Sequence, residues 1–74
     1  MSRLPQVSGR EVVKALKKLG YDRDHQRGSH IVVRQAESPF RRLVVPDHSE
    51  VAKGTLRAII REAGVTVEEF LNLL

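Results

Sequence analysis

The 74-residue chain contains no cysteine and no tryptophan, and it has only three aromatic residues. Without cysteine, neither a disulfide nor a thiolate metal site can stabilise the fold. With so few aromatic side chains, a surface that stacks RNA bases on an aromatic platform is not expected. No apolar run approaches the roughly 20 residues of a membrane span, and residues 1–7 do not have the pattern of a signal peptide. We therefore expect one small soluble domain in the cytoplasm.

Basic residues outnumber acidic residues, and the two kinds are distributed unevenly. The chain has 13 Lys and Arg against 9 Asp and Glu, for a net charge of +4. All the basic residues lie in positions 1–61, whereas the charged residues among positions 62–74 are all acidic. A basic body with an acidic end favours a polyanionic partner such as nucleic acid over an uncharged one.

The first predicted helix begins at a capping box, in which Ser8 and Glu11 each accept a hydrogen bond from an otherwise unpaired backbone amide. Gly20 has the position of a helix-ending glycine. One face of the helix is apolar at the spacing of an α-helix, and it consists of Val12, Val13, Leu16 and Leu19. Residues 1–7 are expected to be a flexible lead with few contacts.

Three short strands are expected in the middle of the chain, at residues 21–26, 30–35 and 41–45. The second strand is the most strongly indicated, because it contains three consecutive β-branched residues. The turns at residues 27–29 and 37–39 are short, so the strands should form an antiparallel meander.

Two further helices are expected, at about residues 53–63 and at residues 67–74, the second after a capping box formed by Thr66 and Glu69. The element order is then helix, three strands, helix and short helix. Residues 8–74 are therefore expected to form a single α+β domain.

Side chains alternate between the two faces of a strand, which decides where His30 points. The buried face is expected to contain Ile31, Val33, Leu43 and Val45. This arrangement leaves His30 and Arg34 on the open face, with Arg42 beside them. The opposite arrangement would bury an arginine, which is costly unless the guanidinium has a partner.

The Arg27-Gly28-Ser29 turn delivers His30 to the start of the second strand, and His30 has two interpretations. It is either a polar residue that hydrogen-bonds the turn, or a general acid or base, since histidine titrates near neutral pH. Ser29 is either an anchor of the turn or a hydrogen-bond donor to phosphate.

The start of the second predicted helix is a candidate phosphate site, because free amides and the helix dipole favour anions there. Lys53, Thr55 and Arg57 would contribute, although the same residues could simply begin a helix. The sequence Lys53-Gly54-Thr55 lacks the upstream glycine of a P-loop. No histidine spacing typical of a metal site is present, and no metal or cofactor is expected.

Several motifs occur together in a definite order and spacing. They are Ser8-Gly-Arg-Glu-Val-Val, Gly20-Tyr21, Gly28-Ser29-His30, Val45-Pro46 followed by His48, and Gly54-Thr55-Leu56-Arg57 through Ala63-Gly64. From about residue 8 to residue 74, this combination resembles the HicA toxin family of bacterial toxin–antitoxin modules.

The resemblance implies a fold like a double-stranded RNA-binding domain, in which helices pack on one face of a three-stranded antiparallel sheet. It implies a toxin of a type II toxin–antitoxin system that cleaves mRNA and is inhibited by a cognate HicB-like antitoxin. The family's catalytic histidine corresponds to His30, and His48 matches a second histidine after the Val-Pro pair. His25 has no counterpart in the family motif.

For such a metal-independent endoribonuclease, the candidates to stabilise the charged phosphorane are Lys53, Arg34 and Arg42. Two alternatives remain open. One is a non-catalytic, basic RNA-binding module on the same fold, which needs the basic surface but not the histidine. The other is an interaction protein whose acidic and apolar C-terminal helix binds a partner.

Overall fold

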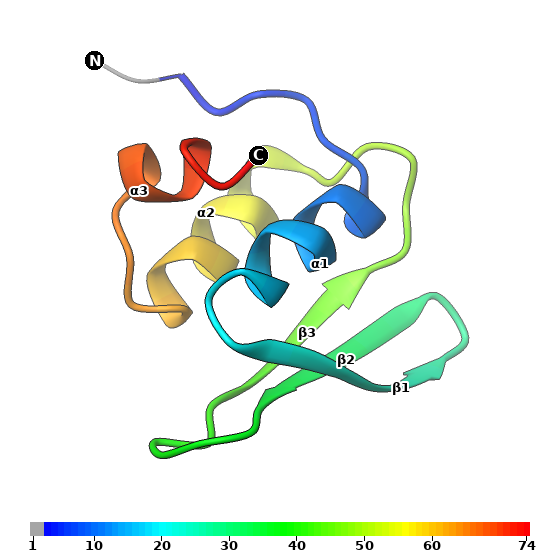
Figure 1. The fold of residues 1–74 in the computed structure, drawn as a ribbon. Coiled ribbons are helices and arrows are strands. Elements are labelled where there is room, and N and C mark those ends of the chain that lie inside the picture. Colours follow the sequence, from blue (N-terminus) through cyan, green and yellow to red (C-terminus); the bar gives the residue numbers. More distant parts are fainter. Residues whose placement is uncertain (1–2) are drawn as a thin grey trace.

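The secondary-structure elements follow one another in the predicted order. The computed structural model describes residues 3–74. Its elements are α1 (Gly9–Lys17), β1 (Tyr21–Arg27), β2 (His30–Gln35), β3 (Arg42–Pro46), α2 (Lys53–Glu62) and α3 (Val67–Leu71) (Figure 1). The structure confirms the predicted α+β class.

The three strands form one open antiparallel sheet in the order β1-β2-β3. Helix α1 contacts β1 and β3, α2 contacts β3, and α3 packs against α2. Figure 1 shows all three helices on the same side of the sheet. Among residues 3–74, no helix covers the other face of the sheet, in keeping with a fold like a double-stranded RNA-binding domain. We call this face the open face.

The predicted alternation of side chains in β2 and β3 is confirmed. Ile31, Val33, Leu43 and Val45 are all buried in the core, with exposures of 3% or less. Val32 is also buried, although it belongs to the open face. Its cross-strand partners are His25 on β1 and Val44 on β3, and these two neighbours flank it within the sheet.

A β-bulge interrupts the pairing of β1 with β2. The register shifts between Arg23, opposite Val33, and His25, opposite Val32, so Asp24 is one residue in excess. Because directly opposed residues share a face, His25 lies on the open face with Val32. The Asp24 carboxylate also reaches that face, since it contacts His25. The bulge therefore places two consecutive polar residues on one face of the sheet.

The segment before α1 contributes to the core. Leu4 and Val7 are buried, and the backbone amide of Val51 donates a 2.8 Å hydrogen bond to the carbonyl oxygen of Val7. The expectation that the lead makes few contacts is therefore wrong for this part of it, because both apolar side chains belong to the hydrophobic core, as does Val51. Residues 1–2 of the predicted lead lie outside the described residues.

Both predicted capping boxes are present, at Ser8 with Glu11 and at Thr66 with Glu69. Helix α3 is shorter than expected and ends at Leu71, although its Phe70 is fully buried. Across residues 3–74, no helix combines the length and apolar character required to span a membrane.

Candidate active site

A tight hairpin turn positions His30. Arg27 and His30 are cross-strand partners, so only Gly28 and Ser29 form the loop between β1 and β2. Gly28 has a φ of 58°, a left-handed conformation that glycine adopts without steric cost and that two-residue hairpins need at their first position. The glycine in the motif thus allows the turn to close directly before His30.

His30, His48 and Thr55 line one hollow at the end of the open face. Val44, Pro46 and Ala52 complete its lining, and its volume is about 350 Å³. These residues come from β2, β3, the following loop and the first turn of α2. The fold therefore brings together three of the side chains that the sequence singled out.

Asp47 connects the two histidine-bearing segments. Its backbone amide donates a hydrogen bond of 2.6 Å to the Ser29 carbonyl oxygen. Its carboxylate accepts a 3.0 Å hydrogen bond from the Gln26 side-chain amide and lies 3.4 Å from Arg10 Nε. Asp47 was not predicted, because these partners are distant in sequence and no local pattern indicates them.

The start of α1 fixes the segment around His48. The backbone amide of Gly9 donates a 2.9 Å hydrogen bond to the carbonyl oxygen of His48. A Cβ atom at Gly9 would overlap the Pro46 carbonyl oxygen, so only glycine allows the helix to approach this closely. The glycine of the Ser-Gly-Arg-Glu motif therefore has a structural role at the hollow.

The comparison with protein families gives a match over most of the chain. The model described as "HicA toxin of bacterial toxin-antitoxin" matches residues 9–65. The chain belongs to the HicA toxin family. The matched range includes His30, His48 and Thr55. Membership of this family identifies the protein as the toxin of a toxin–antitoxin system. No curated protein matches the chain at a significant level.

The other basic residues singled out in this HicA-family chain lie outside the lining of the hollow. Arg34 and Arg42 are exposed cross-strand partners on the open face. Arg34 is four residues along β2 from His30, which corresponds to about 13 Å at the rise of a strand. Lys53 and Arg57 are exposed on α2, and Ser29 is exposed in the turn.

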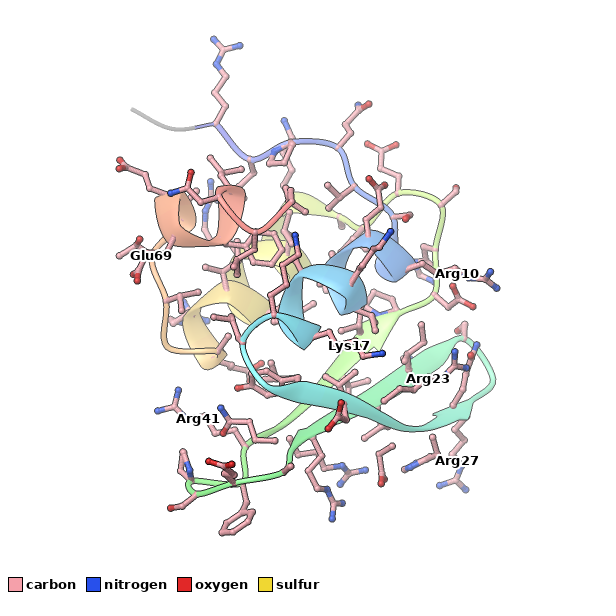
Figure 2. All side chains as sticks on the ribbon, viewed as in Figure 1. Arg10, Lys17, Arg23, Arg27, Arg41 and Glu69 are labelled. Carbon is pink, nitrogen blue, oxygen red and sulfur yellow. The ribbon has the colours of Figure 1, made fainter. Side chains whose placement is uncertain are left out.

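The open face of this HicA-family sheet has mixed charge rather than a uniformly basic character. Asp22 is the cross-strand partner of Arg34, and Arg34 Nη2 lies 3.9 Å from Asp24 Oδ2. Basic side chains are prominent at the two ends of the sheet instead. Figure 2 shows Arg23 and Arg27 toward the β1–β2 hairpin and Arg41 at the opposite end.

A second histidine of the open face is held by a carboxylate. His25 Nδ1 lies 2.7 Å from Asp24 Oδ2. This hydrogen bond lowers the pKa of Asp24 below its ordinary value, and the positive charges of Arg34 and Arg42 lower that pKa further. The sequence did not indicate this pair, because it depends on the bulge at Asp24.

Aromatic side chains contribute little to the open face. The strands contain one aromatic residue, Tyr21, and it is buried in the core. Phe40 is 62% exposed, but it lies in the loop between β2 and β3. The strands therefore present no exposed aromatic side chain on which RNA bases could stack. Within residues 3–74, no group of three or more potential ligands is arranged to hold a metal ion.

Proposed function

We propose that this toxin is a metal-independent endoribonuclease that cleaves mRNA, with His30 as a general acid or base. The observation that carries the proposal is the position of His30. It is exposed at the start of a core strand, and it lines a hollow with His48 and Thr55 in a member of the HicA family. A histidine so placed can serve as a general acid or base toward a bound substrate.

In the proposed reaction, the RNA supplies its own nucleophile. The 2′-hydroxyl attacks the adjacent phosphorus atom, and the bond from phosphorus to the 5′-oxygen breaks. His30 either accepts the proton of the 2′-hydroxyl or donates a proton to the leaving 5′-oxygen, a role typically worth about 10²- to 10⁴-fold in rate. DNA lacks the 2′-hydroxyl, so it would bind without being cut.

The proposed phosphate contacts come from the residues around the hollow. Thr55 lines the hollow, and Lys53 and Arg57 are exposed on the same helix. The first turn of α2 has no acidic residue and no side-chain cap, so its backbone amides are open to an anion. Ser29 would add a hydroxyl donor beside His30.

Arg34 and Arg42 are proposed to bind the RNA farther along the open face. Their distance from the hollow suits contact with a neighbouring phosphate of the chain rather than with the reacting one. We further propose that a HicB-like antitoxin inhibits the toxin by covering the hollow and the open face. The net charge of +4 favours an antitoxin with an acidic contact surface.

The proposal is tested by measuring RNA cleavage by the purified chain in the presence of a chelator. The wild-type protein is expected to cleave RNA, and His30→Ala is expected to lose cleavage while keeping its circular dichroism spectrum. His25→Ala is the matched control, because this exposed histidine does not line the hollow. A 2′-deoxy nucleotide at the cleaved position should stop the reaction. Cleavage by His30→Ala at the wild-type rate would exclude the assigned role.

A non-catalytic RNA-binding module is the second candidate. The exposed Arg34 and Arg42 pair favours it, since phosphate contacts require no histidine. In that case the wild-type chain would bind RNA with an affinity that falls as salt rises, and it would cleave nothing.

A further inference from the structure

We propose that His48 is the second acid–base residue of this site, so that His30 and His48 work as a pair. One imidazole accepts the proton of the 2′-hydroxyl, and the other donates a proton to the 5′-oxygen. This inference rests on the proposed ribonuclease function and adds the group that performs the other half of the proton transfer.

The first observation is that both histidines line the same hollow. His30 enters it from the start of β2, and His48 enters from the loop after β3. Val44 and Pro46 form an apolar wall beside them. A phosphodiester that occupied this hollow would lie beside imidazoles from two separate chain segments, and acid and base catalysis at one phosphate needs two such groups.

The second observation is that neither imidazole has a side-chain partner among residues 3–74. Both side chains belong to exposed residues, and neither makes a hydrogen bond or an ion pair to another residue of the described chain, positions 3–74. Their ring nitrogens are therefore available to a substrate. His25 differs, because its Nδ1 is already engaged by Asp24 and it does not line the hollow.

The third observation is that the backbone holds the two segments in a fixed relation. The backbone amide of Asp47, the residue before His48, donates a hydrogen bond to the carbonyl oxygen of Ser29, the residue before His30. The backbone carbonyl oxygen of His48 accepts a hydrogen bond from the backbone amide of Gly9, at the start of α1. Catalytic groups on such a fixed backbone do not have to be gathered in the transition state, which lowers the entropic part of the barrier.

Other nearby groups fit the second role less well. Arg27 is the cross-strand partner of His30, but a guanidinium does not release its proton in proteins. Thr55 lines the hollow, but a hydroxyl is a weak acid and base at neutral pH. Of the residues that line the hollow, only His30 and His48 carry an imidazole, the group that most often serves as a general acid or base.

The reaction balances with two imidazoles. The neutral imidazole takes the 2′ proton as the O2′–P bond forms, and the protonated imidazole gives its proton to O5′ as the P–O5′ bond breaks. The products are a 2′,3′-cyclic phosphate and a 5′-hydroxyl end. The two histidines finish with exchanged protonation states, and exchange with water restores them.

The test uses a short RNA that contains one site cleaved by the wild-type toxin, together with the same RNA in which the 5′-oxygen at that site is replaced by sulfur. A thiolate leaves without being protonated, so the sulfur substrate does not need the general acid. Cleavage rates are measured for the wild type, His30→Ala, His48→Ala and the control His25→Ala. His48→Gln is measured as well, so that a folding defect of one variant does not decide the result.

On the natural RNA, both His48 variants are expected to cleave about 10²- to 10⁴-fold more slowly than the wild type. The sulfur substrate should restore the rate of one of the two variants, His30→Ala or His48→Ala, and thereby identify the acid. His25→Ala should match the wild type on both substrates.

Two results would overturn the pair. One is cleavage of the natural RNA at the wild-type rate by a folded His48 variant. The other is a failure of the sulfur substrate to restore either histidine variant, which would leave His48 only a binding role. Both differ from failure of the proposed function itself, in which the wild-type chain cleaves no RNA or His30→Ala remains fully active.

Discussion

The backbone amide of Asp47 lies 2.6 Å from the carbonyl oxygen of Ser29 and donates a hydrogen bond to it. This contact joins the end of β3 to the turn that carries His30. The carboxylate of the same residue accepts a hydrogen bond from Gln26, which in turn donates to the Gly28 carbonyl oxygen. Asp47 does not line the hollow, but it thus fixes the turn before His30 through both its backbone amide and its carboxylate.

In the proposed ribonuclease reaction, Asp47→Ala is expected to slow RNA cleavage without abolishing it. Loss of the hydrogen bond to Gln26 should also lower the free energy of unfolding by about 1 kcal/mol. Because Asp47 positions the turn and does not line the hollow, kcat should fall while KM changes little. Steady-state kinetics and urea unfolding measure the two effects.

Asp22→Ala is the control for Asp47→Ala, since it removes an exposed acid of the open face that is remote from the hollow. Its kcat should equal that of the wild type. Equal values of kcat for the two variants would contradict a positioning role for Asp47.

Gly9→Ala is expected to be strongly destabilising. Its added methyl group would overlap the Pro46 carbonyl oxygen, which is backbone and cannot rotate away. Overpacking of this kind typically costs about 1–3 kcal/mol. Chemical denaturation would measure the change in the free energy of unfolding.

The matched variant is Gly54→Ala, in the first turn of α2, where an added Cβ would meet no atom within 4 Å. It should be neutral or raise the free energy of unfolding by up to about 1 kcal/mol, because alanine favours a helix over glycine. Equal free energies of unfolding for the two variants would show that the close approach of α1 to the end of β3 does not limit the residue at position 9.

Tyr21 is expected to ionise above its ordinary pKa of 10.0. Burial raises the pKa of its hydroxyl, and the nearby positive charge of Arg41 opposes this shift only in part. The neutral hydroxyl therefore favours the folded state below pH 10, and this contribution is lost as the pH rises through the raised folded pKa. Tyr21 is the sole tyrosine, so a tyrosinate absorbance titration reports on it alone.

The titration of Tyr21 has a natural complement in Tyr21→Phe. The hydroxyl makes no hydrogen bond of normal geometry to the described residues, although Arg41 is near enough to lower its pKa, so its removal should leave stability unchanged or raise it by about 1 kcal/mol. A titration midpoint at or below pH 10, or a large loss of stability in Tyr21→Phe, would argue against a buried hydroxyl without a partner.

Acid is expected to weaken both capping boxes. Hydrogen bonds from the backbone amide and the hydroxyl of Ser8 lower the pKa of Glu11, and those of Thr66 do the same for Glu69. A carboxylate with a lowered folded pKa adds stability above its unfolded pKa near 4.5, and this stability disappears as the pH falls through the lower folded pKa. The double variant Glu11→Gln with Glu69→Gln should therefore lose less stability on acidification.

Urea midpoints at neutral pH and below pH 4.5 would measure this difference. Glu50→Gln is a suitable control, because this exposed glutamate belongs to neither box. If acid lowered the stability of the double variant as much as that of the wild type, other carboxylates would dominate the acid response.

Local patterns were sufficient to predict much of this fold. The capping boxes at Ser8 and Thr66 depend on residues three positions apart, and the burial of Ile31 and Val33 follows from the alternation of a strand. These features are encoded within one element, so they can be recognised without knowledge of the tertiary structure.

The features that were not predicted depend on contacts between elements. The bulge at Asp24 occurs in the polar part of β1, residues 22–26, which has no apolar alternation to fix its register. The role of Asp47 depends on Gln26 and Arg10, which reach it only in the folded domain. His30, His48 and Thr55 were likewise predicted as separate candidates, but the hollow that brings them together was not.

The attachment of the N-terminal segment has a consequence for the order of assembly. The contacts Val7 to Val51, Gly9 to His48 and Arg10 to Asp47 close long loops of chain. Because loop closure of this length costs chain entropy, we expect these contacts to form together with the packing of the helices on the sheet. A partly synthesised or partly unfolded chain would carry His30 without a finished hollow. We therefore expect the hollow to be complete only when the N-terminal segment has packed against the loop after β3.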